Sequence, residues 1–230
     1  MMLATRALAE EQMDAPDLDP AVYARVLADL ARVNTVTMAR RPTLSFLDRV
    51  AKRGGGALRI LDVGFGDGDM LRRIAAWAKR RGQAVELVGI DLNPRSREVA
   101  AAATPANFTI DYRTGDYADL AEEPWDVILS SLVAHHMSDA QLIAFLRFME
   151  AHAQRGWFIN DLHRHSFAYL GYPLLARLAG WHRIVREDGQ LSIARSYRPA
   201  EWPPILAEAG ITGARVFRTF PFRLCVEAIR

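Results

Sequence analysis

Short apolar runs alternate with stretches of helical spacing between residues 57 and 162. The apolar runs predict strands at 58–63, 85–91, 107–112, 125–131 and 155–161. Apolar residues at helical spacing predict helices between them, at about 69–81, 94–103 and 138–153. This alternation favours an α/β fold with a doubly wound, mostly parallel sheet that helices cover on both faces. Ligands of such sheets bind beyond the carboxyl ends of the strands.

The chain before residue 57 predicts an N-terminal helical lid. One helix is expected after Leu18-Asp19-Pro20, where the aspartate can cap and the proline can occupy the first turn. A second helix is expected from about residue 35 to 52, with an interruption or restart near Pro42. Residues 1–19 are mixed and acidic, and we expect them to be unstructured or loosely packed.

The chain after residue 162 departs from the alternation once and then completes the sheet. Residues 165–198 contain an aromatic helix and a polar connection with Asp188-Gly189, which we expect to form an insertion over the active-site face. A helix at about 199–209 then leads to two strands, 211–217 and 221–228, joined by residues 218–220. These strands predict an antiparallel C-terminal hairpin, which makes seven strands in all.

Composition narrows the classes of partner. The 230 residues are 50% apolar and 24% charged, which is enough for one good-sized core. Lys and Arg number 29 against 27 Asp and Glu, so the formal charge of +2 is too even for a nucleic-acid-binding surface. A small-molecule partner is therefore favoured, and the oligomeric state is left open.

The cysteine content and the apolar runs bear on the compartment. The single cysteine, Cys225, supports neither a disulfide framework nor a thiolate metal site, so a reducing cytoplasm is expected. No apolar run is long enough for a transmembrane helix, and the first residues carry acids where a secretory signal would be apolar. We expect neither export nor membrane insertion.

The stretch ILDVGFGDGDM, residues 60–70, ends a predicted strand in a glycine-rich turn. Such a turn presents backbone N–H groups and bare backbone to a ligand. A dinucleotide site would need its third glycine at position 69, but that residue is Asp69, and Asp67 and Asp69 would repel a pyrophosphate. Carboxylates suit a cationic ligand better, because they can hold an ammonium group by a charge-assisted hydrogen bond.

The sequence DVGFGDG at 62–68 resembles motif I of class I S-adenosylmethionine-dependent methyltransferases. VGIDLNP at 88–94 resembles the second motif, which implies that Asp91 accepts hydrogen bonds from the ribose hydroxyls. RTGDYADL at 113–120 resembles the third, which implies that Asp116 accepts from the adenine amino group and that the Tyr117 backbone N–H donates to the ring. WDVILSSLVAHHM at 125–137 resembles the fourth strand and the loop that approaches the methionine part.

The resemblance covers about residues 57–162 and implies a Rossmann-like domain over 57–230, with the insertion at 165–198 and an N-terminal cap at 1–56. Taken singly, Asp91 could cap the next helix and Asp116 could be a solvated turn acid. Together, at successive strand ends, they favour S-adenosylmethionine as the cofactor. The implied cofactor-binding residues are Asp62, Gly64, Gly66, Asp67, Gly68, Asp91, Leu92, Asp116, Tyr117 and Ser131.

Missing motifs exclude several subclasses of methyltransferase. The N/D-P-P-Y/F motif of nucleic-acid amino-methyltransferases is absent after the fourth strand, and the glutamate pair Glu122-Glu123 precedes that strand rather than following it as in arginine methyltransferases. Catechol-type enzymes hold a divalent metal with an acid at that strand end and an Asp-Asn pair after the next strand. Here the first place is a serine and the second is Asn160-Asp161, so a metal is not expected.

Two further patterns point to small-molecule enzymes. S-x-x-x-H-H at 131–136 resembles ubiquinone/menaquinone-type methyltransferases. FINDLHRH at 158–165, the aromatic insertion and FPFRLCV at 220–226 resemble O-methyltransferases associated with polyketide phenols. The expected acceptor is therefore small, aromatic and largely apolar.

Methyl transfer to a phenol or quinol requires alignment of the acceptor and removal of its proton. Histidine is the natural base, because its ordinary pKa lies near neutral pH. We take His136 and His163 as the candidate bases, although a single histidine more often caps a helix or packs against a lid. His135, Phe167 and Tyr172 are candidates for contact with the acceptor, and Asp161 is a candidate to orient a histidine.

The expected function is S-adenosylmethionine-dependent O-methylation of a phenol or quinol. Three alternatives stay open. C-methylation of a quinone-type ring also needs a base, an NAD-dependent oxidoreductase has a related fold, and an intact glycine loop is equally compatible with a non-catalytic cofactor-binding protein.

Overall fold

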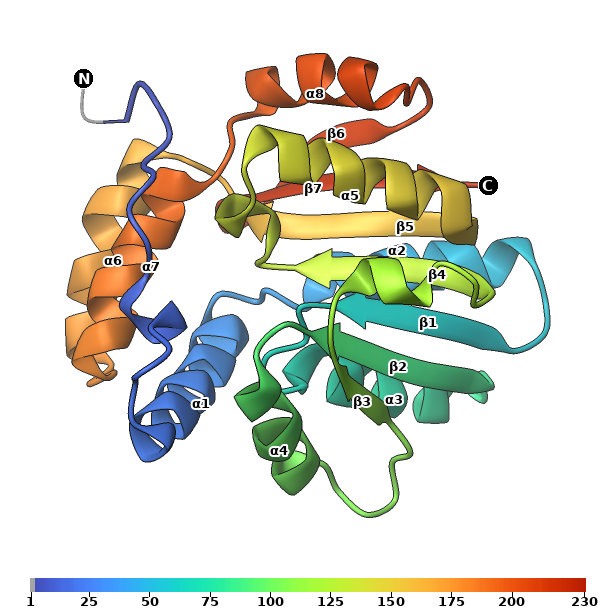
Figure 1. Ribbon diagram of the computed structural model, residues 1–230, viewed down its shortest axis with the longest axis horizontal. Helices are drawn as coiled ribbons and strands as arrows, with labels where there is room; N and C mark the ends of the chain where they lie inside the picture. The colour runs from blue at the N-terminus through green and yellow to red at the C-terminus, as the bar shows by residue number, and fades with distance from the viewer. Residues whose placement is uncertain (1–2) are drawn as a thin grey trace.

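Seven strands form one mixed sheet within residues 3–230, the part of the chain that the computed structural model describes (Figure 1). The strand order is β3-β2-β1-β4-β5-β7-β6, and every pairing is parallel except the two made by β7. The strands are β1 (Leu58–Val63), β2 (Val85–Asp91), β3 (Asp111–Thr114), β4 (Trp125–Ser131), β5 (Ala153–Leu162), β6 (Arg215–Thr219) and β7 (Arg223–Ile229). The predicted doubly wound, mostly parallel sheet with an antiparallel C-terminal hairpin is confirmed.

Helices cover both faces of this sheet (Figure 1). One face carries α2 (Arg41–Arg53), α3 (Asp69–Arg81) and α4 (Pro94–Ala103), and the other carries α5 (Asp139–His152) and α8 (Trp202–Ala209). On the first face, Phe46 stacks on Phe158 with ring centroids 4.9 Å apart. On the second, Trp125, Trp157 and Trp202 are almost fully buried in one cluster. The two apolar layers hold the strands rigidly, so their carboxyl ends have fixed positions.

Three helices lie beyond the carboxyl ends of the strands, at the left in Figure 1. They are α1 (Pro20–Val36), α6 (Ser166–Leu178) and α7 (Arg183–Arg195), and they share a small core that includes Val26, Trp181 and Val185. Asp19 caps α1 by accepting the backbone N–H groups of Ala21 and Val22. These helices have the positions expected of the N-terminal lid and the insertion, whereas α2 packs on the sheet.

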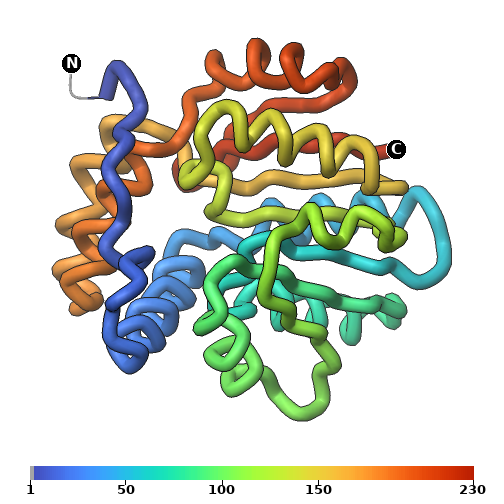
Figure 2. Tube along the Cα trace, in the orientation of Figure 1, coloured from blue at the N-terminus to red at the C-terminus, as the bar shows by residue number. Residues whose placement is uncertain are grey.

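The N-terminal segment, residues 3–14, runs along α7 and is tied down by polar contacts (Figure 2). Arg6 donates to the carbonyl of Arg195 at 2.7 Å, and the Asp188 carboxylate accepts the N–H groups of Gln12 (3.1 Å) and Met13 (2.9 Å). Glu11 is only 4% exposed. The expectation that this segment is loosely packed is therefore wrong. Polar contacts hold it in place, and the sequence of the segment shows no periodic pattern of apolar residues that would have predicted this.

The insertion contains two helices where the sequence predicted one helix and a polar connection. Asp188 and Gly189 lie inside α7. The Asp188 side chain binds the N-terminal segment, and Gly189 packs under a ring of α6. A Cβ at Gly189 would lie 2.3 Å from the Tyr172 ring. The turn signal of an Asp-Gly pair is thus overridden by tertiary packing.

The bounds of β3 and of both strands of the C-terminal hairpin also differ from the prediction. β3 begins at Asp111, whereas Phe108 and Ile110 pack against the core from the preceding loop. The C-terminal hairpin is shifted toward the end of the chain, with its link at residues 220–222. Along the described chain, the helices are too short or too polar to serve as membrane spans.

We expect Asp188→Ala to loosen the N-terminal segment. The substitution leaves the partly buried backbone N–H groups of Gln12 and Met13 without this acceptor. It should lower the unfolding free energy by roughly 1 kcal/mol, the lower end of the cost of an unsatisfied buried donor. Hydrogen exchange of residues 11–14 should accelerate. The exposed Glu208→Ala, on α8, is the matched control, because a surface carboxylate of this kind contributes about 0–1 kcal/mol. Equal exchange in the two variants would contradict the anchoring role.

Candidate functional site

The glycine turn between β1 and α3 lies at the centre of the carboxyl edge of the sheet. Gly64, Gly66 and Gly68 all have positive φ angles, of 76°, 56° and 75°. A Cβ at Gly64 would lie 2.4 Å from a methyl group of Val133, in the loop after β4, and one at Gly68 would lie 2.4 Å from the Tyr112 hydroxyl. The turn therefore requires glycine for both its conformation and its close packing.

Asp62, the penultimate residue of β1, is buried to 2% exposure directly before this turn. Its Oδ1 atom has no hydrogen-bond partner among the residues described. Burial, and then the neighbouring charges of Asp91 and Asp69, raises the pKa of its carboxyl to about 8. A buried acceptor without a partner is costly, so a ligand that donates here, above all a cationic one, would be stabilised.

Asp91 ends β2, next to β1, and faces the same turn. Its carboxylate accepts the backbone N–H of Gly66 at 2.9 Å and that of Asn93 at 2.8 Å. Asn93, and not Asp91, caps α4 by accepting the N–H of Arg95. Burial raises the pKa of the Asp91 carboxyl, although these hydrogen bonds act against it. Each oxygen keeps a lone pair for a further donor such as a hydroxyl.

The other two acids of the turn are neutralised locally. The Oδ1 atom of Asp67 accepts the N–H of Asp69, and its Oδ2 atom pairs with Arg72 at 2.9 Å. Asp69 pairs with Arg40, at the start of α2, at 2.5 Å. The carboxylates left to match a cationic ligand are therefore Asp62 and Asp91. The predicted repulsion of a pyrophosphate by Asp67 and Asp69 is correspondingly weaker than the sequence suggested.

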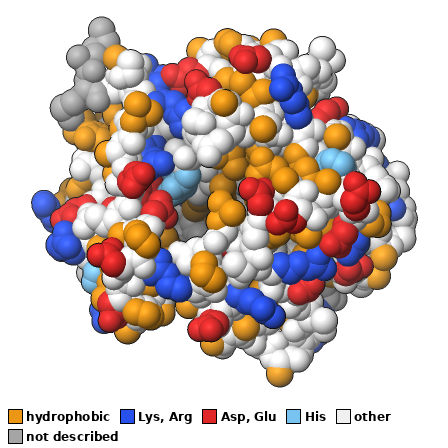
Figure 3. Space-filling model, in the orientation of Figure 1, with side chains coloured by type: hydrophobic (Ala, Val, Ile, Leu, Met, Phe, Trp, Pro, Cys, Tyr) orange, Lys and Arg blue, Asp and Glu red, His pale blue; other side chains and the backbone are white. Residues whose placement is uncertain are grey.

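The remaining predicted cofactor residues occupy the same edge. The N–H of Gly115 donates to the carbonyl of Asp91, which joins the loops after β3 and β2. Asp116 is exposed and accepts the N–H of Ala118 at 2.9 Å. The Tyr117 ring packs on α5, Leu92 is 73% exposed, and Ser131 ends β4. In the space-filling view, a hollow opens to the left of the centre, between the lid helices and the rest of the molecule (Figure 3).

Comparison with known proteins agrees with this geometry. Residues 60–156, which contain the glycine turn and the ends of β2, β3 and β4, match the family model of a methyltransferase domain. The chain carries an S-adenosylmethionine-dependent methyltransferase domain. An unpartnered carboxylate at Asp62 and free lone pairs at Asp91 fit a cofactor that bears an ammonium group and two ribose hydroxyls.

Solved methyltransferase structures share the fold along almost the whole chain. The plantazolicin methyltransferase BpumL, in complex with a pentazolic desmethylPZN analog and SAH, is 15% identical with a TM-score of 0.67 over 91% of both chains. Magnesium protoporphyrin IX methyltransferase (ChlM) from Synechocystis PCC 6803, with bound SAH, is 18% identical with a TM-score of 0.57 over 95% of this chain and 91% of its own.

A SAM-dependent methyltransferase from Aquifex aeolicus is also 18% identical, with a TM-score of 0.60 over 93% of this chain and 99% of its own. At such identities the likeness concerns the fold. No curated protein matches the sequence significantly.

The loop of the methyltransferase domain after β4 carries a buried histidine network. His135, 3% exposed, has its Nδ1 atom 2.7 Å from the Asp161 carboxylate and its Nε2 atom 3.5 Å from Glu11. Burial lowers the pKa of His135, but Asp161 and Glu11 outweigh it and raise the pKa to about 9. Asp161 also accepts the backbone N–H of His135. The predicted orienting role of Asp161 thus applies to His135, which is buried within protein contacts.

His136 is partly exposed and lies between two carboxylates of the N-terminal segment. Its Nδ1 atom is 3.2 Å from Asp14, and its Nε2 atom is 3.8 Å from Glu11. Both ring nitrogens therefore face acids. The sequence argument missed Glu11 and Asp14, and no motif in residues 1–19 could have indicated them, because their partners lie far along the chain.

His163 lines a different pocket, of about 450 Å³, at the end of β5. Burial, and then the neighbouring groups His165, Arg218, Arg198 and Arg164, lower the pKa of His163 to about 4, so it is neutral near pH 7. The other lining residues are His165, Arg218, Thr219, Phe220 and Phe222. This pocket combines aromatic rings with positive charge.

Phe167 and Tyr172, the aromatic residues predicted to contact the acceptor, lie in different surroundings: one is exposed and the other is packed inside the lid. Phe167 is 76% exposed and stacks on His165, which links it to the β5 pocket. Tyr172 donates from its hydroxyl to the carbonyl of Val185 and packs inside the lid, which gives it a structural role.

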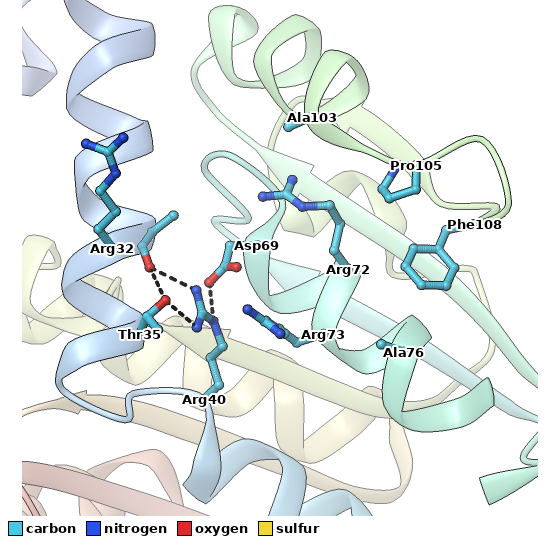
Figure 4. Close-up of a pocket in the computed structure, with 11 residues that line it drawn as sticks. Arg32, Thr35, Arg40, Asp69, Arg72, Arg73, Ala76, Ala103, Pro105 and Phe108 are labelled. Carbon is cyan, nitrogen blue, oxygen red and sulfur yellow. Dashed lines mark hydrogen bonds and ion pairs between the residues drawn. The ribbon is translucent and has the colours of Figure 1, made fainter. Parts of the chain in front are cut away.

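A further pocket, of about 410 Å³, lies outside the carboxyl edge, between α1, α3 and the loop after α4 (Figure 4). Arginines dominate its lining. Arg40 reaches across it to Asp69, Thr35 and the carbonyl of Ala31 (Figure 4). These contacts tie α1 to the first turn of α3 and so support the glycine turn.

The raised pKa of Asp62 predicts a pH-dependent stability for the cofactor-free protein. The folded state binds the proton of Asp62 more tightly than the unfolded state, whose ordinary pKa is near 3.8. The stability that the folded protein gains from this tighter proton binding is complete below about pH 4 and is lost as the pH rises to about 8. Asp62→Asn should therefore gain stability relative to wild type from acidic to alkaline pH. Thermal unfolding at pH 5 and pH 9, with the exposed Asp119→Asn as control, measures it, and a constant difference would contradict it.

Proposed function

We propose that this protein transfers the methyl group of S-adenosylmethionine to a hydroxyl of a small, largely apolar aromatic acceptor such as a phenol or quinol. The observation that carries the cofactor site is the buried, unpartnered carboxylate of Asp62 under the glycine turn. The names of the plantazolicin and magnesium protoporphyrin IX methyltransferases support a small-molecule acceptor for this fold. When bound, the cofactor supplies an already activated methyl group.

Asp62 and Asp91 are the residues that we assign to the cofactor. Asp62 accepts from its ammonium group, and Asp91 accepts from its ribose hydroxyls through lone pairs that the bonds to Gly66 and Asn93 leave free. The bare backbone at Gly66, where a Cβ would meet nothing closer than Leu27 at 3.8 Å, lets the ligand approach closely. Asp116 and the Tyr117 backbone at the end of β3 complete the adenine side, together with exposed Leu92.

The β5 pocket is our candidate site for the acceptor. It lies at the carboxyl end of β5, which is the neighbour of β4 in the sheet, and its phenylalanine rings match a flat apolar molecule. The positive groups that keep His163 neutral also favour the phenolate form of an acceptor. The neutral His163 can accept the hydrogen bond of the phenol hydroxyl while Arg218 stabilises the oxygen. A pKa near 4 makes His163 a weaker proton acceptor than an ordinary histidine.

His136 is the second candidate base, but its ring nitrogens both face carboxylates. Its removal should therefore reduce methyl transfer less than removal of His163. The sequence did not rank His136 and His163 as candidate bases, and the difference in methyl transfer between the two variants would rank them.

We expect Asp62→Asn to weaken binding of both S-adenosylmethionine and S-adenosylhomocysteine by about 10- to 100-fold, because a charge-assisted hydrogen bond is lost. Calorimetric titration measures the dissociation constants, with Asp119→Asn as the matched control. Tight binding of a nicotinamide dinucleotide instead of these ligands would favour the oxidoreductase alternative.

We expect His163→Ala to lower kcat for methyl transfer by about 10²-fold, the lower end of the usual contribution of a general base, because its lowered pKa weakens it as a proton acceptor. The assay uses cofactor labelled in its methyl group and a panel of phenols and quinols, and product analysis distinguishes O- from C-methylation. His152→Ala, on α5, is the matched control. Unchanged transfer by His163→Ala with unchanged cofactor affinity would reject the base role, and absence of transfer by wild type would favour a binding protein.

A further inference from the structure

Three side chains from two distant parts of the chain converge beside the loop after β4. The Oε1 atom of Glu11 lies 3.5 Å from Nε2 of His135 and 3.8 Å from Nε2 of His136. One ligand atom from each residue lies within 4.8 Å of the other two. Glu11 and His135 are almost fully buried, whereas His136 is partly exposed.

These separations are too long for good hydrogen bonds, which measure about 2.7–3.2 Å between nitrogen and oxygen. They resemble the edges of a metal coordination sphere. Ligand atoms held about 2.0–2.2 Å from a tetrahedral zinc ion lie roughly 3.3–3.6 Å apart. Small side-chain adjustments, with release to water of the proton on Nε2 of His135, would therefore bring all three atoms into coordination.

Neighbouring groups orient each of the three side chains. Asp161 lies 2.7 Å from Nδ1 of His135, which directs Nε2 toward Glu11. The Ser192 hydroxyl donates to Oε1 of Glu11 at 2.8 Å, and Asp14 lies 3.2 Å from Nδ1 of His136. A carboxylate on the distal nitrogen of a histidine is the usual support for a metal-binding imidazole.

The charge balance also favours a cation at this point. Three carboxylates, those of Glu11, Asp14 and Asp161, surround the two imidazoles. Arg6 and Arg195 lie nearby, but they donate to backbone carbonyls of residues 135–137. The ligand atoms themselves therefore face one another without an arginine between them.

We propose that Glu11, His135 and His136 bind a divalent transition-metal ion, for which Zn²⁺ is the best match to the donor set. Two imidazoles and one carboxylate leave a fourth position open for water or for an oxygen of another ligand. Because Glu11 belongs to the N-terminal segment, the ion fastens that segment to the loop after β4. The sequence argument against a metal considered only the ends of β4 and β5, and it did not include Glu11.

The test is a Zn²⁺ titration of the full-length protein after treatment with a chelator, without cofactor or acceptor. Wild type should bind one ion per chain. Glu11→Gln should weaken the affinity at least about 100-fold, since loss of a direct ligand exceeds the 10- to 100-fold effect of a supporting residue. Glu10→Gln, at the exposed neighbouring position, is the matched control and should bind as wild type does.

Two further measurements guard against loss of folding. His136→Ala alters a partly exposed residue and should also weaken Zn²⁺ binding, with an unchanged circular dichroism spectrum. Zn²⁺ should slow hydrogen exchange of residues 6–14 in wild type but not in Glu11→Gln. Absence of stoichiometric binding by wild type, or equal affinity in wild type and folded Glu11→Gln, would overturn the proposal. Neither result depends on methyl transfer, so failure here is distinguishable from failure of the proposed function.

Discussion

The buried carboxylate of Asp62, held under a left-handed glycine turn, is the constraint on which the carboxyl edge of the sheet depends. Parallel pairing on both sides brings the ends of β2 and β4 against it, so that Asp91 and the loop after β4 meet at one point. The positive φ angles of the turn bring backbone without side chains to this point, while the N–H groups of Gly64, Gly66 and Gly68 donate within the protein. Desolvation makes a negative charge at Asp62 unfavourable without a cation, and a cationic ligand removes that penalty. Stability and ligand binding thus make opposite demands on one residue.

The parts of the fold with strong local signals could be predicted from the sequence. The observed bounds of β1 and α3 match the prediction, because an apolar run ends in glycines before α3, and Gly82, in the left-handed region, ends that helix. β3 was predicted too early, since Phe108 and Ile110 are apolar for packing and do not pair in the sheet. Apolar content indicates burial, and it specifies a strand only where backbone pairing accompanies it.

The surroundings of the histidines could not be predicted, because tertiary contacts alone create them. Sequence placed His135, His136 and His163 at or just past the carboxyl ends of two strands. In the structure the first two lie in a short helix after β4, and His163 directly follows β5. The sequence could not show that His135 is enclosed by Asp161 and Glu11, or that positive neighbours keep His163 neutral. Glu11 stands in a stretch without periodicity, so its burial follows only from contacts with Ser192 and the histidines. Local sequence patterns do not specify such contacts between residues far apart along the chain.

The loop after β4 connects the two halves of the site physically. Val133 packs on Gly64 of the cofactor turn, while the carbonyls of His135 and His136 are held by Arg195 of the lid helix α7. The same arginine donates to the carbonyl of Ala9, and Arg6 donates to Met137. Any displacement of the N-terminal segment must therefore change the hydrogen bonds of this loop. A continuous chain of contacts therefore runs from the N-terminal segment through this loop to the cofactor turn.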